Sequence, residues 1–295
     1  GVIGEFALGR AGGAGPVGSF GMCTEARFGK RKPGELVGYI PVLGSLALAI
    51  GYTCVMGWIF KYTFLAFDGG LSAMGQDMDA IVGSLNATAG AWGANVWVVV
   101  AVAVSFFIMS FGIAGGIEKA TRILIPLLFI LLVVVCIRSL TLPNAMEGLK
   151  FLFMPDFSRI DGSVVLMAMG LAFFKMSIGF GCMITYGSYF RSDTHVPFLA
   201  VRVMVCDLLV SILAGIAVFP AVFSFGFEPT AGTSLLFLTI PAVFASMPGG
   251  QLFTTLFFVL SAVASMGAML SLLEVPVAWL SETFRISRPR ATVLM

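Results

Sequence analysis

Long apolar stretches are the feature that most restricts how this chain can fold. Several exceed the roughly 18 to 20 apolar residues that a helix needs to cross the hydrocarbon core of a bilayer. Of the 295 residues, 59% are hydrophobic and 11% are charged, a composition that no soluble core of this size requires. The sequence lacks the alternation of apolar and polar residues that marks a membrane β-barrel. It therefore predicts an all-α fold, a polytopic helical membrane protein.

The order of the spans follows from where the apolar stretches begin and end. Six complete spans can be drawn, at about 38 to 67, 94 to 114, 123 to 142, 163 to 190, 197 to 226 and 252 to 280. A partial span at 1 to 9 precedes them, and an apolar run begins again in the final "ATVLM". The first residue is not methionine, so we expect 1 to 295 to be a single transmembrane domain truncated at both ends.

One apolar segment does not fit the pattern of a span. The stretch "SLLFLTIPAVFASMPGG", at 234 to 250, is too short to cross and contains Pro241 and Pro248. It predicts a capping or re-entrant loop that gates access from the outer side.

The positions of Lys and Arg predict the orientation, because basic loops are retained on the cytoplasmic side. Of the 17 Lys and Arg, twelve lie in or beside alternate loops, four lie on the opposite side, and Lys175 lies within a span. The acidic loop 68 to 92 carries no base. We therefore expect a multi-pass protein of the plasma (inner) membrane. Its cytoplasmic loops would be 10 to 35, 115 to 122, 191 to 196 and 281 to 290.

Other function classes find little support. The net charge is +2, which gives no reason to expect a nucleic-acid partner. The five cysteines lack the paired spacing of a metal site or a disulfide framework, and the single His195 lies in a polar loop. No HExxH, Gly-x-Ser-x-Gly or P-loop signature is present. We expect neither an enzyme, nor a metal, nor a cofactor.

A charge and a helix breaker share one predicted span. Lys175 lies in the span 163 to 190, where a charged residue costs about 2.5 to 3.5 kcal/mol on insertion scales. Ser177, Gly179 and Gly181 follow, and each glycine weakens a helix by about 1 kcal/mol. Small residues also serve ordinary helix packing in membranes. Together with Lys175 they favour a discontinuous helix, whose freed backbone groups can bind ions and zwitterions.

The residues around this break resemble a known family. "FFKMSIGFGCMITYGSYF" is similar to the unwound sixth helix of the neurotransmitter:sodium symporter family. Six further stretches match in the same order, namely "GEFALGR", "GYTCVMGW", "GGIEKATRILIP", "GLKFLFMPDFSRI", "FLTIPAVFASMPGG" and "LSLLEVPVAWL". The resemblance implies a leucine-transporter-type fold with inverted repeats and a broken central helix. It covers the end of the second helix to the eighth, without the first helix, which supplies much of the family's site.

The resemblance also implies a substrate site for an amino acid. Tyr52 matches the third-helix tyrosine whose hydroxyl holds the substrate carboxylate, and Ser177 would face the polar end of the substrate. Positions that line the side-chain pocket match Leu48, Phe174, Phe180 and Leu272. This apolar lining implies a hydrophobic or aromatic amino acid. Glu5 matches an acidic residue that braces the broken segments, although an interfacial carboxylate is the simpler alternative.

The ion sites depart from the family pattern. At the first sodium site, Lys175 replaces a hydroxyl, and Cys206, next to Asp207, replaces an asparagine. At the second site, the matching positions are Ala264, Gly267 and Ala268, which offer no side-chain oxygen, and a shift of three residues would bring in Ser265 or Ser271. The chloride position is Val210. Lys175 could replace sodium as a tethered cation, with Asp207 or Glu5 nearby, or extend to the membrane surface instead.

These implications define two hypotheses. The first is a secondary active, symporter-like transporter that moves amino acids by alternating access, with atypical or lost sodium sites and with sodium or protons as coupling ion. The alternative is a transport-incompetent truncated or sensor-type membrane protein of the same family. The expected partners are an amino-acid substrate and the lipid bilayer. The sequence does not indicate an oligomeric state.

Overall fold

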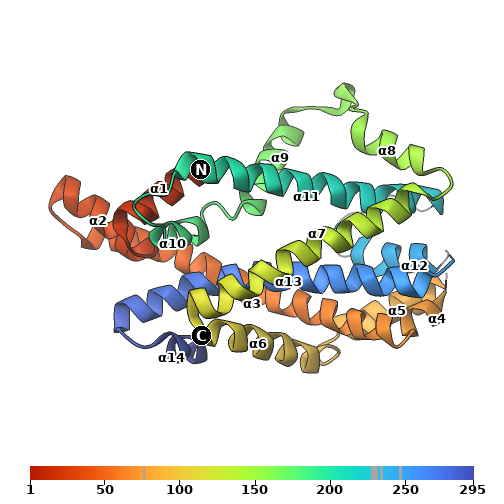
Figure 1. The fold of residues 1–295 in the computed structure, drawn as a ribbon, viewed down its shortest axis with the longest axis horizontal. Helices are drawn as coiled ribbons and strands as arrows, with labels where there is room; N and C mark the ends of the chain where they lie inside the picture. Colours follow the sequence, from red (N-terminus) through yellow and green to blue (C-terminus); the bar gives the residue numbers. More distant parts are fainter. Residues whose placement is uncertain (76, 227–231, 233–234, 246–247) are drawn as a thin grey trace.

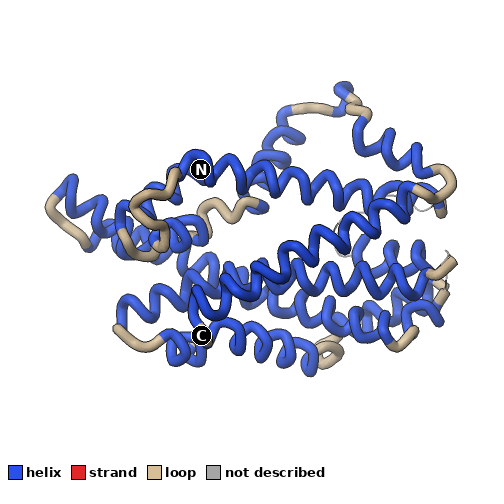
Figure 2. The backbone as a smooth tube through the Cα atoms, viewed as in Figure 1, coloured by secondary structure: helices blue, strands red, loops and turns tan. Residues whose placement is uncertain are grey.

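The chain forms a bundle of helices in a computed structural model (Figures 1 and 2). The structure describes residues 1–75, 77–226, 232, 235–245 and 248–295, apart from the side chains of 113, 114 and 159. Within these ranges every regular element is helical. The all-α prediction is therefore confirmed.

Four helices are long and apolar enough to cross a membrane, which confirms a polytopic membrane protein. They are α3 (Lys32–Phe67), α7 (Glu118–Leu140) with the preceding π-helical turn η1 (Ile113–Ile117), α11 (Val196–Ser224) and α13 (Gly250–Phe284). Two shorter apolar helices, α6 (Asn95–Ser110) and α9 (Gly162–Lys175), lie at two further predicted spans. The predicted range 38 to 67 lies inside α3, which begins at Lys32.

Several further helices are short. The first lies at the predicted partial span 1 to 9, Cys182–Ser188 lies inside the predicted span 163 to 190, and the others occupy segments that the sequence left as connections. They are α1 (Val2–Gly12), α2 (Pro16–Phe28), α4 (Gly70–Met74), α5 (Met78–Ala89), α8 (Ala145–Phe153), the 3₁₀ turn η2 (Phe157–Arg159), α10 (Cys182–Ser188) and α14 (Arg288–Leu294). The predicted cytoplasmic loop 10 to 35 thus contains a helix, α2, with Pro16 in its first turn and Gly29 as a left-handed C-cap. Proline fits a first turn because its missing N–H would be unpaired there.

The predicted gating loop is helical in its described part. Residues Leu235–Thr239 form a π-helical turn, η3, and Ile240–Ala245 form α12. Positions 234, 246 and 247 of the predicted loop lie outside the described residues. Phe237 and Val243 are fully buried, so this segment packs into the bundle. Because these apolar side chains are buried, the described part of the segment is not a freely solvated loop.

The largest core cluster joins α3, α7, α11, α12 and α13. Tyr62 of α3 lies at its centre, with its ring centroid 4.8 Å from that of Phe237 and 5.4 Å from that of Phe258. The Tyr62–Phe237 pair is edge-to-face and the Tyr62–Phe258 pair is tilted, and aromatic pairs at such distances add about 0.5 to 1.5 kcal/mol each to the free energy gained by burial. The cluster holds α12 against the long helices.

The four predicted cytoplasmic loops lie at one end of the bundle. The Arg10 guanidinium donates to the carbonyl oxygens of Thr194, at 2.5 Å, and of Ser192. The backbone N–H of Gly15 donates to both carboxylate oxygens of Glu282, at 3.1 and 3.0 Å. In Figure 1, α1, α2, α10 and α14 gather toward the left, and α4, α5 and α12 toward the right. The basic segments therefore share one end, and the acidic loop 68 to 92 lies at the other.

Candidate functional site

The predicted span 163 to 190 is broken at its middle, as the sequence predicted. Helix α9 ends at Lys175 and α10 begins at Cys182. Between them Gly179 and Gly181 have φ values of 90° and 77°, a left-handed region that glycine adopts without the Cβ penalty of other residues. Ser177 also has a positive φ, 51°, which is uncommon for a residue with a side chain. The last carbonyls of α9 are largely paired across the turn, since those of Ala172, Phe173 and Phe174 accept from the N–H groups of the three residues that follow Lys175.

Glu5 of α1 holds the broken segment directly. The backbone N–H of Gly179 donates to Glu5 Oε1 at 2.7 Å. The other carboxylate oxygen, Oε2, is buried and has no hydrogen-bond partner among the described residues. Helix α1 packs along α10, where the rings of Phe6 and Phe190 lie 5.0 Å apart. The carboxylate predicted to brace the break therefore lies against it.

Most of the predicted substrate residues lie in one cluster beside the break. Leu48 and Tyr52 of α3, Phe180 of the break and Leu272 of α13 belong to the same apolar cluster. The ring of Phe174, at the end of α9, lies 6.0 Å from that of Phe180 in an edge arrangement. The structure thus brings together residues more than 200 positions apart in the sequence.

Two of the predicted polar residues, Tyr52 in this cluster and Ser177 in the break, have half-buried side chains. Tyr52 is half-buried, and its hydroxyl makes no hydrogen bond to any residue of the described part of the chain. Ser177 is also half-buried, in the non-helical segment that follows α9. A half-buried hydroxyl without a protein partner can donate to a ligand.

Lys175 pairs with Asp207 of α11. Its ammonium nitrogen lies 3.0 Å from Asp207 Oδ2 and 3.5 Å from the Asp207 carbonyl oxygen, and it also donates to Ser211 Oγ. Of the two carboxylates considered from the sequence, the structure therefore places Asp207 with the lysine and Glu5 with Gly179. Cys206, the residue before Asp207, is exposed.

The positions predicted for the second ion site lie on one side of α13. Ala264 and Ala268 are exposed, and a Cβ on Gly267 would meet nothing within 4 Å. Ser265 is buried and donates to its own helix, to Ala262 O at 2.9 Å. Ser271 instead reaches α10, where its hydroxyl lies 3.2 Å from that of Tyr186. The chloride position, Val210, packs against the main core.

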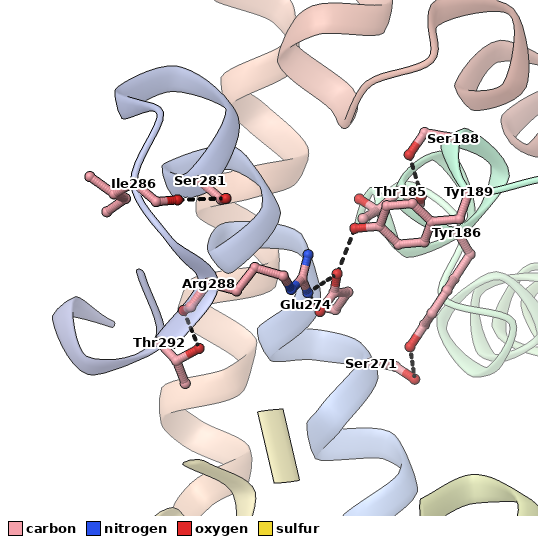
Figure 3. Close-up of polar contacts among 10 residues, drawn as sticks. All are labelled: Thr185, Tyr186, Ser188, Tyr189, Ser271, Glu274, Ser281, Ile286, Arg288 and Thr292. Atoms are coloured by element: carbon pink, nitrogen blue, oxygen red, sulfur yellow. Dashed lines mark hydrogen bonds and ion pairs between the residues drawn. The ribbon is translucent and has the colours of Figure 1, made fainter. Parts of the chain in front are cut away.

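A buried polar cluster at the basic end was not predicted (Figure 3). Glu274 of α13 is 0% exposed, and both of its carboxylate oxygens accept hydrogen bonds from Arg288 Nη2. The hydroxyl of Tyr189, directly after α10, donates to Glu274 Oε1 at 2.5 Å. Because an unpaired buried carboxylate is costly, these two partners account for its burial. The cluster ties α10, α13 and the start of α14 together.

A signal for this cluster was present in the sequence. Glu274 lies inside the apolar span 252 to 280, where a carboxylate marks a functional position by default. Arg288 was counted only as a basic loop residue that sets the orientation. In the structure its side chain is directed into the bundle, toward Glu274, as Figure 3 shows.

This architecture defines a class of protein: a multi-pass helical membrane protein with a broken central helix beside an apolar cluster. The chain belongs to the sodium:neurotransmitter symporter family, whose profile matches residues 75–295. The resemblance drawn from the sequence is therefore confirmed. Since the relatives are transporters, the expectation that the chain is not an enzyme is confirmed too.

Three relatives illustrate the relationship. An uncharacterized sodium-dependent transporter of Haemophilus influenzae is 34% identical over 263 residues, covering 88% of this chain and 58% of the relative. The uncharacterized sodium-dependent transporter YhdH of Bacillus subtilis is 34% identical over 279 residues, covering 94% of this chain and 60% of YhdH. The crystal structure of MhsT in complex with L-phenylalanine has a TM-score of 0.86 and 37% identity, covering 99% of this chain and 65% of MhsT. The chain thus spans about three-fifths of the length of these relatives.

Proposed function

We propose that this chain functions in a secondary active transporter for hydrophobic or aromatic amino acids, in the plasma membrane. The observation that carries the proposal is the cluster of Leu48, Tyr52, Phe180 and Leu272 beside the helix break. The neighbour MhsT, whose structure holds L-phenylalanine, supports an apolar amino acid as the ligand.

The chemistry of the site suits a zwitterion with an apolar side chain. The Tyr52 hydroxyl would donate to the substrate carboxylate. The hydroxyl of Ser177, in the non-helical segment between α9 and α10, would accept from the substrate ammonium. The apolar cluster would take up the substrate side chain, which contributes about 25 cal/mol for each Å² of apolar surface removed from water. Charged side chains would meet no counterion in this pocket and would be excluded.

The buried cluster at the basic end would close the pathway on that side. Tyr189 and Tyr186 fasten α10 to α13 through Glu274 and Ser271, and Arg288 completes the ion pair. In alternating access these contacts would hold while the site faces the opposite side, and would break when the basic end opens. We place this end on the cytoplasmic side, because the basic loops lie there.

The coupling ion is the part of the proposal in which this chain departs most from its relatives. The names of the relatives from Haemophilus influenzae and Bacillus subtilis favour sodium. Lys175 occupies one of the expected positions, and Ala264, Gly267 and Ala268 supply no side-chain oxygen at the other. We therefore propose a transporter with weak sodium dependence, in which protons are the alternative coupling ion.

Equilibrium binding of an amino-acid panel to the purified gene product that carries this chain tests the proposal. We expect L-phenylalanine and L-leucine to compete for one site, while L-aspartate and L-lysine bind at least 100-fold more weakly, since an unpaired charge in the pocket costs about 3 kcal/mol or more. Equal competition by the charged amino acids would contradict the proposed lining. The absence of binding by every amino acid tested would favour the transport-incompetent or sensor-type alternative.

A further inference from the structure

The turn between α2 and α3 carries a dense group of basic residues. Arg27 lies in the last turn of α2, Lys30 and Arg31 lie in the connection, and Lys32 is the first residue of α3. All four residues are exposed. In Figure 1 this turn forms the left-hand extreme of the molecule, at the basic end of the bundle. It therefore presents a concentrated positive charge directly before one of the long apolar helices.

One of these charges is already neutralised by the chain itself. Arg31 Nε lies 2.7 Å from Glu35 Oε1, and Arg31 Nη1 lies 3.8 Å from Glu25 Oε2. Within the part of the chain that the structure describes, no carboxylate pairs with the other three basic residues, Arg27, Lys30 and Lys32. Three neighbouring cations are thus available to an anionic ligand.

The turn that carries these charges is held firmly. Gly29 ends α2 in the left-handed conformation, with φ 65°. The hydroxyl oxygen of Thr24, on α2, accepts from the backbone N–H of Gly34, on α3, at 3.1 Å. A Cβ on Gly34 would lie 2.0 Å from the carbonyl oxygen of Phe20, so the two helices touch through their backbones. A preorganised turn loses little conformational entropy when it binds a ligand.

The length of α3 places this turn at the surface of the membrane. A helix of 36 residues is about 54 Å long, so it extends beyond the roughly 30 Å hydrocarbon core into the headgroups. Leu36, which is 69% exposed, lies one turn beyond Lys32, about 6 Å along the axis. The ring of Phe28 is also exposed, with the Arg27 guanidinium carbon 5.7 Å from its centroid. Basic and aromatic side chains together are typical of segments that lie in the interface.

We propose that the turn from Arg27 to Lys32 is a binding site for the headgroup of an anionic phospholipid, with the Phe28 ring inserted at the boundary of the acyl chains. Its three unpaired cations donate to the lipid phosphate. Each Lys or Arg near an anionic surface contributes a factor of about five, so the three together contribute about 100-fold. The proposed orientation puts this turn at the cytoplasmic leaflet, which carries anionic lipids. Lipid binding here requires neither an amino-acid substrate nor transport.

Native mass spectrometry of the purified gene product that carries this chain, in a nonionic detergent, tests the site by counting bound lipids. The probes are phosphatidylglycerol and phosphatidylcholine with identical acyl chains. We expect wild type to bind its first phosphatidylglycerol about 100-fold more tightly than its first phosphatidylcholine. In the triple variant Arg27→Gln/Lys30→Gln/Lys32→Gln this preference should fall to about threefold or less, because the remaining charges are paired or distant.

Three further variants separate the site from general effects. Lys150→Gln removes an exposed base on α8, far from this turn (Figure 1), and should leave the preference unchanged. Glu25→Gln removes one carboxylate partner of Arg31 and should tighten phosphatidylglycerol binding by up to about fivefold, a gain that misfolding cannot produce. Phe28→Ser keeps every charge but should weaken phosphatidylglycerol binding, because it removes the inserted ring. If the triple variant does not fold, Lys30→Gln alone should weaken that binding by about fivefold.

Two results would overturn the proposal. One is a wild-type protein that binds the two phospholipids equally well. The other is a preference for phosphatidylglycerol that persists unchanged in the triple variant. Binding of L-phenylalanine is measured separately on the same proteins. A lipid preference in a protein that binds no amino acid therefore supports this site and contradicts the proposed function, and the converse result contradicts this site alone.

Discussion

The hydroxyl of Tyr189 donates a 2.5 Å hydrogen bond to the fully buried carboxylate of Glu274, joining residues 85 positions apart. Tyr189 directly follows the second half of the broken helix, and Glu274 lies on a helix that spans the length of the bundle. The contact therefore couples the moving part expected of a transporter to its surrounding scaffold. Arg288 supplies the charge that makes the carboxylate stable there.

Removing Arg288 should destabilise the protein strongly. Breaking a buried ion pair from one side leaves an uncompensated charge, which costs about 3 to 5 kcal/mol. We expect Arg288→Gln to lower the free energy of unfolding by that amount, measured in detergent. The exposed Arg290, two residues away, offers a matched control, and Arg290→Gln should change little. Equal effects of the two substitutions would contradict the role assigned to Arg288.

The double variant Glu274→Gln/Arg288→Gln should recover part of this loss. It removes both charges and leaves two neutral side chains of similar size. Replacing a buried pair by uncharged groups is far less costly than removing one partner. A double variant as unstable as Arg288→Gln alone would show that the destabilisation comes from packing and not from the unpaired carboxylate.

The hydroxyls of Tyr189 and Tyr186, at the closed end, should contribute differently to the free energy of unfolding. Tyr189→Phe removes a hydrogen bond to a charged group, worth about 1.5 to 3 kcal/mol, whereas Tyr186→Phe removes one to the hydroxyl of Ser271, worth about 0.5 to 1.5 kcal/mol. If these contacts close the pathway, Tyr189→Phe should raise the rate at which a water-soluble maleimide labels Cys182, which is buried at the start of α10.

That labelling requires a background in which the exposed Cys23, Cys54 and Cys206 are serine. Cys136, buried in the main core, serves as the internal reference and should stay unlabelled. Labelling of Cys182 and Cys136 that rises in parallel would indicate general unfolding. An unchanged rate of maleimide labelling at Cys182 in Tyr189→Phe would contradict the proposal that the Tyr189 contact closes the pathway.

The two glycines of the break should respond differently to alanine. Gly181 has φ 77°, and a Cβ there would lie 2.6 Å from Pro16 Cγ and 3.2 Å from Pro41 Cβ. Gly179 has φ 90°, but a Cβ there would meet nothing within 4 Å. Either alanine variant would carry backbone strain of about 1 to 3 kcal/mol, and Gly181→Ala adds overpacking of about 1 to 3 kcal/mol. Thermal unfolding that ranks Gly179→Ala as the less stable variant would contradict this geometry.

Much of the site could be predicted because its signals are local. The Ser-Ile-Gly-Phe-Gly run that begins two residues after Lys175 predicted the break, since glycines combined with a mid-span charge favour a discontinuous membrane helix. The presence of the long helices followed from apolar length, although α3 begins at Lys32 and not at 38, and α7 at Glu118 and not at 123. Glu5 was expected near the break, and a direct hydrogen bond to Gly179 joins them.

The polar cluster could not be predicted because its partners meet only in three dimensions. Arg288 has the same local context as Arg285 and Arg290, and only the fold directs it onto Glu274. Helix α2 was missed for a different reason: it lies at the end of the bundle, where polar residues face water and the apolar run stops. Its Pro16 and Gly29 were nevertheless recognisable as start and stop signals.

Sodium replacement tests the ion assignment in a functional setting. Uptake by the gene product that carries this chain, with sodium replaced by choline at two pH values, should show weak sodium dependence in wild type. Lys175→Thr introduces a hydroxyl in place of the ammonium and should increase that dependence, because oxygen ligands suit a hard cation. Steep dependence in wild type that persists unchanged in Lys175→Thr would show that the lysine does not replace a cation.

The most direct test of the amino-acid site is the hydroxyl of Tyr52. Equilibrium binding of L-phenylalanine should weaken by about 1 to 3 kcal/mol in Tyr52→Phe, a factor of roughly 5 to 150, because the substrate carboxylate loses a buried hydrogen bond. Tyr39 lies on the same helix and does not itself belong to the cluster, although its ring contacts Trp279 at the edge of that cluster. Tyr39→Phe keeps this ring and removes only a hydroxyl, so it is the matched control and should leave the affinity unchanged. An affinity for L-phenylalanine in folded Tyr52→Phe equal to that of wild type would contradict the account.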